Sequence, residues 1–250
     1  MSKVFEALEH AAEEKVPIAR LNLEIASQRR TRQTEEALVT SVRSMEPEMR
    51  RLHQSLSSRI HDPSKKVFLF VSANSGEGTS TIVREFGQLL AETQKKSVLL
   101  LDYDPQHITQ HQSFGIQPQK GLFSNVGGWE GWRQAVSQVP HSRISLSLVF
   151  DRYQEDSPAD QSVAHEEIWS GLRKEFDTIL IDSPAGGVSE DAFSLCLLVD
   201  GVILVLEAES TRSQVVANTK NRIIQSGGNI LGVVFNKQRQ YIPEWVYKRL

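Results

Sequence analysis

The chain has 250 residues, of which 39% are hydrophobic and 24% are charged. These values are ordinary for a soluble globular protein and exclude the collagen-like, disordered and disulfide-scaffold classes. The 28 Lys and Arg residues stand against 31 Asp and Glu residues, for a formal charge of -3. This balance argues against nucleic acid or anionic lipid as a partner. Because Cys196 is the only cysteine, the chain can form no internal disulfide, and we expect a cytoplasmic protein.

Residues 1–46 are predicted to form a helical extension and linker, followed by one domain over 47–250. The stretch up to residue 62 has no glycine, and its apolar residues recur at helical spacing. Pro47 falls inside one such stripe, so we expect a new helix to start near it and to end at about Ile60. That helix is expected either to pack on its own domain or to dock on a partner.

The chain has no segment suited to crossing a membrane. Its N-terminus lacks the apolar core of a signal peptide, and the most apolar window, Phe193–Ala208, is short and interrupted by Asp200 and Gly201. A membrane role would therefore need a partner. Because Met1–Lys15 is amphipathic without a basic face, we expect it to dock on that partner protein rather than on lipid.

After Pro63, short apolar runs alternate with amphipathic stretches, which predicts a doubly wound α/β fold with a mainly parallel sheet and helices on both faces. The predicted strands are Val67–Ser72, Val98–Asp102, Leu146–Phe150, Thr178–Asp182, Gly201–Leu206 and Leu231–Asn236. The predicted helices cover about 80–94, 163–175, 189–198 and 212–226.

The first strand runs into a glycine-bearing loop, Ala73-Asn-Ser-Gly-Glu-Gly-Thr-Ser-Thr81, and a helix follows. Strand, glycine loop and helix are the context of a phosphate-binding loop, because the glycines let backbone N–H groups turn toward phosphate oxygens. The common pattern ends in Gly-Lys-Ser/Thr, but Thr79 stands at the lysine position. A tight turn without a ligand is the alternative interpretation of this loop alone.

Two further strands end in acids: Val98–Asp102 is followed by Tyr103-Asp104, and Thr178–Asp182 by Ser183-Pro184. The carboxyl ends of parallel strands meet at one edge of a sheet, where ligands bind. Carboxylates beside the Ser80 hydroxyl would form a magnesium site of hard oxygen ligands. One acid alone would be read as a helix cap, but three matching strand ends favour the site.

The seven histidines show no complete metal-ligand pattern. His107 and His111 are four residues apart on a predicted helix, but no third ligand is evident. We therefore expect them to be solvated polar residues.

The loop and the acidic strand ends resemble the deviant-Walker P-loop family, which includes the bacterial tyrosine kinases and the Min and Par ATPases. The similarity to the kinase module of polysaccharide chain-length co-polymerases covers about residues 47–240. Its markers are Ser-Gly-Glu-Gly at 75–78, Leu-Leu-Leu-Asp-Tyr-Asp at 99–104, Ile-Leu-Ile-Asp-Ser-Pro at 179–184 and Gly-Val-Val-Phe-Asn at 232–236.

The resemblance implies that ATP or ADP binds together with Mg2+. It implies that Asp102 activates the attacking hydroxyl or orients the magnesium shell, that Asp104 holds magnesium, and that Asp182 holds it through water. Asn236 would contact adenine. The loop residues expected at the nucleotide are Ser75, Gly76, Glu77, Gly78, Thr79, Ser80 and Thr81. The implied partner is a membrane-bound co-polymerase or export complex.

Departures from the family pattern leave three functions open. Because Thr79 cannot carry the lysine charge, the first is a nucleotide-binding regulator of exopolysaccharide synthesis with weakened catalysis. The second is an active tyrosine autokinase or ATPase that receives another cation in cis or in trans; Tyr241 and Tyr247 are its candidate acceptors. The third is a Min/Par-like positioning ATPase, against which Asn74 argues, since relatives carry a lysine there. Self-association stays open, because the oligomerisation motif matches only at Arg50.

Overall fold

The computed structural model describes residues 45–60, 62, 66–103, 108–117, 121–122, 131–149, 162–186 and 191–238. Backbone contacts divide the chain into Met1–Glu46 and Pro47–Leu250. Almost all of the first unit lies outside the described residues. The predicted extension over 1–46 and the predicted docking segment Met1–Lys15 lie there too, and both stay predictions.

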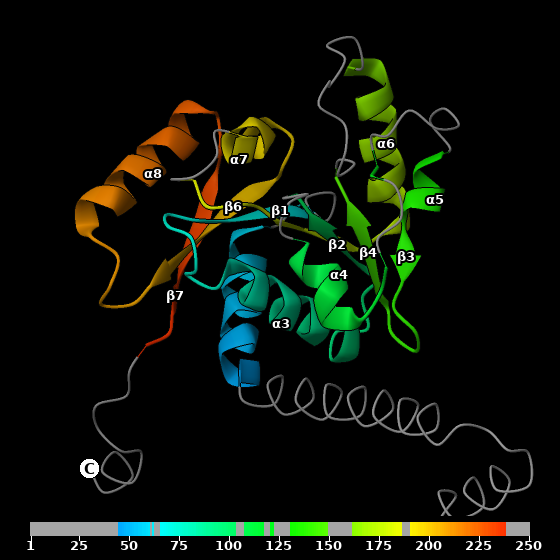
Figure 1. Cartoon of the computed structure of the whole chain (residues 1–250), viewed down its shortest axis with the longest axis horizontal. Coiled ribbons are helices and arrows are strands. Elements are labelled where there is room, and N and C mark those ends of the chain that lie inside the picture. The colour runs from blue at the N-terminus through cyan, green and yellow to red at the C-terminus, as the bar shows by residue number, and fades with distance from the viewer. Residues whose placement is uncertain are drawn as a thin grey trace, which may run out of the picture. The chain divides into compact units, whose positions relative to one another are not determined.

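The described part of the second unit is built on a seven-stranded sheet in the order β3-β4-β2-β5-β1-β6-β7 (Figure 1). Every neighbouring pair is parallel except β3 and β4, which are antiparallel. The fold is therefore the predicted α/β fold with a mainly parallel sheet. The strands are β1 Val67–Ser72, β2 Val98–Asp102, β3 Ser137–Gln138, β4 Ile144–Leu148, β5 Thr178–Asp182, β6 Gly201–Glu207 and β7 Ile230–Asn236.

Helices cover both faces of the sheet (Figure 1). One face carries α3 (Thr79–Glu92), α4 (Thr109–Phe114) and the helix over 45–59. The other face carries the following elements: α5 (Trp132–Ala135), α6 (Ser162–Glu175), α7 (Asp191–Ser194), the 3-10 helix η2 (Leu195–Leu197) and α8 (Ser213–Gln225).

The alternation of side chains along each strand feeds two apolar layers. In β1, Leu69 and Val71 belong to the layer that includes Leu172 of α6, and all three are fully buried. Phe70 faces the other side, where its ring centroid lies 6.1 Å from that of Phe86 in α3. Burial on both faces explains why these strands read as continuous apolar runs.

The predicted bounds differ most from the structure in two elements. The strand predicted at Leu146–Phe150 begins earlier, at Ile144, where β4 pairs in register with Val98 of β2. Ser145 and Ser147 interrupt the apolar pattern of this strand, so the sequence did not mark its start. Ser147 is nevertheless fully buried, and its hydroxyl donates to the carbonyl of Ala135. The helix predicted over 189–198 is split, because α7 ends at Ser194 and a 3-10 turn follows.

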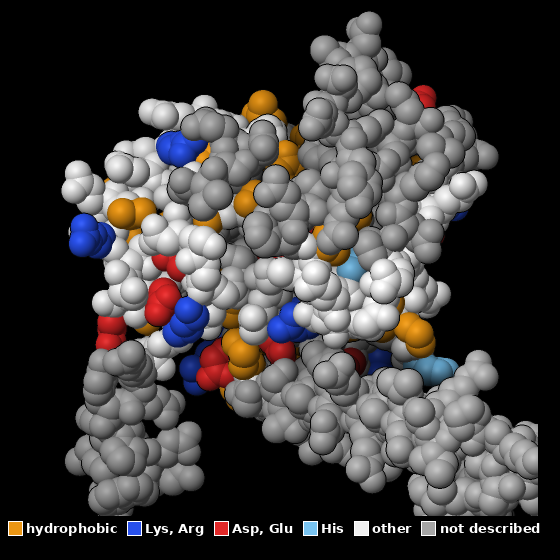
Figure 2. Space-filling view, viewed as in Figure 1, with side chains coloured by type: hydrophobic (Ala, Val, Ile, Leu, Met, Phe, Trp, Pro, Cys, Tyr) orange, Lys and Arg blue, Asp and Glu red, His pale blue; other side chains and the backbone are white. Residues whose placement is uncertain are grey.

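The surface carries no large field of one charge on the face in Figure 2, where basic and acidic side chains of the described residues are interspersed. None of the described helices is long and apolar enough to span a bilayer.

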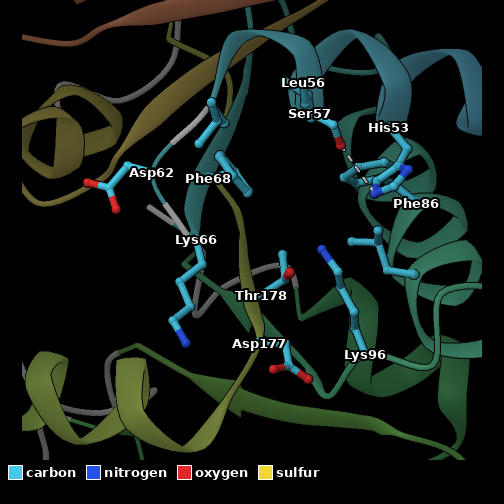
Figure 3. A pocket seen from close by; sticks show the side chains of 12 residues that line it. His53, Leu56, Ser57, Asp62, Lys66, Phe68, Phe86, Lys96, Asp177 and Thr178 are labelled. Atoms are coloured by element: carbon cyan, nitrogen blue, oxygen red, sulfur yellow. Dashed lines mark hydrogen bonds between the residues drawn. The ribbon is translucent and has the colours of Figure 1, made fainter. Parts of the chain in front are cut away.

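One pocket of about 300 Å³ lies at the edge of the sheet where β1 and β5 begin (Figure 3). Its apolar wall includes Leu56 of the helix over 45–59 and Phe86 of α3. Its polar rim includes Lys66, Lys96 and Asp177, so cations and a carboxylate face one another there. The strand ends that carry the predicted site residues lie at the opposite edge.

Candidate functional site

The predicted phosphate loop connects the end of β1 at Ser72 to the start of α3 at Thr79. Gly76 and Gly78 have φ angles of 82° and 92°, in the left-handed region that favours glycine. A Cβ on Gly78 would lie 2.1 Å from Nδ2 of Asn236, so this glycine also permits the close approach of β7. Both the backbone conformation of the turn and the close approach of Asn236 therefore favour glycine at position 78.

The buried Glu77 side chain folds back and organises this loop from within. Its Oε2 accepts hydrogen bonds from the backbone N–H groups of Ala73 (2.9 Å) and Asn74 (3.1 Å). Its Oε1 accepts from Nδ2 of Asn74 (3.0 Å) and from the hydroxyl of Thr211. Glu77 therefore engages the first two N–H groups of the loop, and it acts on the shape of the loop rather than at the pocket surface.

The end of β7 holds the loop from the other side. Asn236 donates from Nδ2 to the carbonyl of Glu77 at 2.8 Å. The next residue, Lys237, donates from Nζ to the carbonyl of Gly76 at 2.6 Å and to Oε2 of Glu207 at 3.0 Å. A single pair of consecutive residues thus fixes two consecutive peptides of the loop.

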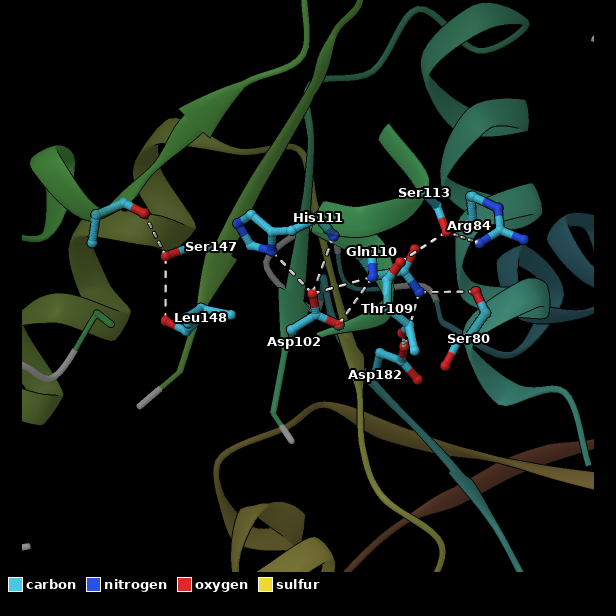
Figure 4. Close-up of polar contacts among 11 residues, drawn as sticks. Ser80, Arg84, Asp102, Thr109, Gln110, His111, Ser113, Ser147, Leu148 and Asp182 are labelled. Carbon is cyan, nitrogen blue, oxygen red and sulfur yellow. Dashed lines mark hydrogen bonds and ion pairs between the residues drawn. The ribbon is translucent and has the colours of Figure 1, made fainter. Parts of the chain in front are cut away.

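Asp102 and Asp182 stand beside each other, because they are register partners at the carboxyl ends of β2 and β5. Both are buried. Helix α4 covers Asp102, whose carboxylate accepts from the backbone N–H of Gln110 at 3.2 Å and is hydrogen-bonded to Nδ1 of His111 at 3.0 Å (Figure 4). Within the fold, α4 supplies the donors that this carboxylate needs.

Asp182 is covered by the same helix. Its Oδ2 accepts from Nε2 of Gln110 at 2.8 Å and from the hydroxyl of Thr109 at 3.1 Å (Figure 4). Burial and, after it, the charge of the neighbouring Asp102 raise the pKa of Asp182 to about 6, even though hydrogen bonds from Gln110, Ser80 and Thr109 lower it. The two carboxylates are thus buried side by side, in surroundings that disfavour the negative charge of Asp182.

The loop and the acids share one pocket of about 330 Å³. The predicted site residues that line it are Ser75, Gly76, Gly78, Thr79, Ser80, Asp102 and Asp182. Glu77, Thr81 and Asn236 do not line it; Glu77 and Asn236 instead support the loop from behind. Asp104 lies outside the described residues.

The residues present fit magnesium in part. Ser80 and Asp182 both line the pocket and offer hard oxygen donors. Thr109 and Gln110 both donate to Oδ2 of Asp182, and the Ser80 side chain also hydrogen-bonds this carboxylate, so the two candidate ligands lie next to each other. Asp102 does not fit in the same way, because its carboxylate is already satisfied by α4. No group of three or more His, Cys, Asp and Glu suited to a metal occurs in the described part of the chain.

The expectation that His111 is solvated was wrong, since only 1% of its side chain is exposed. Helix α4 lies across the ends of β2 and β4, and this packing buries the ring beside Asp102. The roles of Gln110, Thr109 and Lys237 were also missed. Of these residues, only Lys237 could have been suspected from the sequence, because it directly follows the predicted site residue Asn236.

Comparison with known proteins relates the chain to a set of kinases. It is 25% identical over 181 residues to the tyrosine-protein kinase CpsD of Streptococcus agalactiae, covering 72% of this chain and 78% of that protein. It is 27% identical over 182 residues to the tyrosine-protein kinase YwqD of Bacillus subtilis, covering 71% and 75%. The succinoglycan biosynthesis transport protein ExoP of Rhizobium meliloti is 26% identical over 176 residues, 69% of this chain but 22% of ExoP. No protein-family model matches.

Solved structures share the fold. The chimerical protein CapA2B2 superposes with a TM-score of 0.65 at 20% identity, covering 77% of this chain and 84% of that one. The kinase domain of the Escherichia coli tyrosine kinase ETK gives 0.60 at 16% identity, covering 78% of each. The MinD cell division protein of Aquifex aeolicus gives 0.54 at 20% identity, with coverage of 74% and 72%. The chain therefore shares the fold of these solved proteins.

Proposed function

We propose that this chain, a homologue of the bacterial tyrosine kinases of capsule and exopolysaccharide systems, binds ATP or ADP with Mg2+ and regulates polysaccharide polymerisation or export. One observation carries the proposal. The glycine loop and the two acidic strand ends, which are far apart in sequence, meet around one pocket. In α/β sheets, ligands bind at this edge.

Within this function, the loop residues would receive the phosphates and Ser80 with Asp182 would hold magnesium. Magnesium would supply charge for the phosphates, and backbone N–H groups at the start of α3 would add donors. Asp102 would orient the attacking hydroxyl only after its bonds to α4 are broken. The absence of lysine at Thr79 and the engagement of Asp102 both favour weak phosphoryl transfer.

The partner in this proposal is a membrane-bound co-polymerase or export complex. One relative, ExoP of Rhizobium meliloti, is a succinoglycan biosynthesis transport protein, which supports a partner in polysaccharide transport. We place the protein at the cytoplasmic face of the membrane, recruited by that partner through Met1–Lys15. An active tyrosine autokinase is the second candidate, favoured by the kinase homologues themselves; a Min/Par-like role is disfavoured because Asn74 stands where a lysine would be needed.

Calorimetric titration with ATP and ADP, paired with a turnover measurement, tests the function. We expect binding that depends on magnesium and that weakens in Ser80→Ala. Turnover should be slow or absent. Equal affinity with and without magnesium would contradict the site. Turnover with phosphorylation of Tyr241 or Tyr247 would favour the autokinase.

A further inference from the structure

The negative charge of the pocket is not balanced by a basic side chain among the described residues that line it. Two carboxylates, Asp102 and Asp182, line it, and no Lys or Arg is among the described residues that do. The nucleotide would bring further negative charge. Thr79 stands where a lysine would compensate this charge, but its buried hydroxyl has no hydrogen-bond partner in the fold and carries no charge.

Two arginines near the site, Arg84 and Arg222, do not line the pocket and make hydrogen bonds elsewhere. Arg84, one turn into α3, donates from Nη1 to the hydroxyl of Ser113 at 2.7 Å (Figure 4). Arg222 donates to the carbonyl of Gly186 at 2.9 Å, and its guanidinium stacks 4.2 Å from the ring centre of Phe193. Neither side chain contacts the loop in these bonds.

Lys237 does contact the loop. Its ammonium lies 2.6 Å from the carbonyl of Gly76, a residue that itself lines the pocket. Its backbone is in the left-handed region, with a φ of 55°, an uncommon conformation for a residue other than glycine. The hydrogen bond from Asn236 to the loop, 2.8 Å long, fixes where this lysine starts. The ammonium does not line the pocket in this structure, but the fold holds it against the carbonyl of a residue that does.

The second partner of the Lys237 ammonium is Glu207, and this ion pair is weak enough to be exchanged for another. Glu207 lies 3.0 Å away, and the two side chains are 33% and 47% exposed. An exposed ion pair of this kind binds its members weakly, because water screens it. A phosphate is a stronger partner for an ammonium than an exposed carboxylate, since it presents several charged oxygens.

We propose that Lys237 is the phosphate-facing cation of this site in place of the missing loop lysine. Its ammonium keeps the carbonyl of Gly76 and exchanges Glu207 for the phosphates of the bound nucleotide. This rests on the proposed function, since it requires a nucleotide in the pocket. It also names the cation in cis that an active site without a loop lysine needs.

The exchange predicts opposite effects for the two members of the ion pair. Lys237→Met should weaken ATP and ADP binding roughly tenfold, the size expected for one charge-assisted hydrogen bond. Glu207→Gln should strengthen binding roughly two- to fivefold, because the ammonium is released from a competing carboxylate. Lys237→Arg keeps the charge and should retain most of the affinity. Lys220→Met, an exposed lysine on α8, is the matched control and should change nothing.

The ligand series separates charge from shape. The loss in Lys237→Met should be large for ATP and ADP and small for adenosine, which has no phosphate. Thr79→Lys introduced into Lys237→Met should restore ADP affinity. Melting temperatures of all variants should stay close to that of the wild type, because the ion pair is half exposed. The measurement is calorimetric titration at fixed magnesium and low salt.

Two results would overturn the inference while leaving the function intact. One is wild-type binding of ATP with no loss in Lys237→Met. The other is an equal loss in Lys237→Met and Glu207→Gln for all ligands, which would show that the pair only braces the loop. If Lys237→Met does not fold, the sign of the Glu207→Gln effect still decides. A wild-type protein that binds neither ATP nor ADP would instead contradict the proposed function itself.

Discussion

Asp102 and Asp182 are register partners in neighbouring parallel strands, and the short helix α4 donates hydrogen bonds to both carboxylates. Two buried acids side by side repel each other and lose their hydration. Helix α4 offsets part of that cost with backbone and side-chain donors. The helix is thus coupled to the chemistry of the site through the donors Thr109, Gln110 and His111.

Gln110 connects α4 both to the start of α3, at Ser80, and to the buried Asp182. Its Nε2 donates to the carbonyl of Ser80 and to Asp182, both at 2.8 Å. Gln110→Ala should lower the free energy of unfolding by about 1–3 kcal/mol, because a buried carboxylate loses a donor. Urea unfolding measures this. Gln112→Ala, exposed on the same helix, should stay within about 0.5 kcal/mol of wild type. Equal effects would mean that the amide contributes nothing specific.

We expect His111 to contribute more to the free energy of unfolding when Asp102 is present than when it is replaced. His111→Phe keeps an aromatic ring but removes the Nδ1 contact, so we expect a loss of about 1–3 kcal/mol. In the Asp102→Asn background the same change should cost less, because the carboxylate that needs the donor is gone. A double-mutant cycle by urea unfolding gives the coupling. Strict additivity would show that the two side chains do not interact.

Glu77 should control nucleotide affinity without touching the nucleotide. Glu77→Ala leaves the N–H groups of Ala73 and Asn74 without their partner and frees the loop from Thr211. We expect a loss of about 2 kcal/mol in stability and a loss of ADP affinity of roughly tenfold or more. Glu92→Ala, at the exposed end of α3, is the control. An unchanged affinity in a folded Glu77→Ala protein would mean that the loop keeps its shape by other contacts.

Thr79 should be the position where charge restores turnover. Thr79→Lys places an ammonium at the start of α3, beside the pocket that Thr79 lines. Gain of one preorganised charge contact should raise ATP turnover, on the order of 10²–10³ at most. Thr79→Met gives similar length without charge and should not. If Thr79→Lys folds, binds ATP and remains no faster, the engagement of Asp102 by α4 becomes the better explanation for slow catalysis.

Asp182 should make the magnesium-free protein less stable as pH rises. Its folded pKa is raised from 3.8 to about 6, so between these values the folded state holds a proton that the unfolded state has lost. Stability therefore falls across that window and levels off above it. At about 1.4 kcal/mol per pKa unit, the fall is on the order of a few kcal/mol.

The variant Asp182→Asn removes this titration. Its free energy of unfolding should fall less than that of wild type between about pH 4 and about pH 7. Urea unfolding across that range, in chelator, checks the difference in slope. Parallel pH profiles would show that Asp182 is not a group whose ionisation is opposed by the fold.

The sequence by itself determined most of the strands of the sheet and the edge at which the loop and the two acids meet. Buried parallel strands need unbroken apolar runs, and a phosphate loop needs glycines at fixed positions, so both leave a local trace. Strands Val67–Ser72, Val98–Asp102 and Thr178–Asp182 were predicted with their bounds for this reason. The order of the elements then placed the loop and both acids at one edge.

Only the tertiary structure decided how these groups are used. Lys237 meets Gly76 across 161 positions of the chain, and Thr211 meets Glu77 across 134. No local pattern encodes such pairs, because they arise from the close approach of β6 and β7 to the loop. His111 looked like a solvated residue until α4 was seen to pack it against Asp102. Burial of a polar side chain depends on which element covers it, and the folded structure shows which one does.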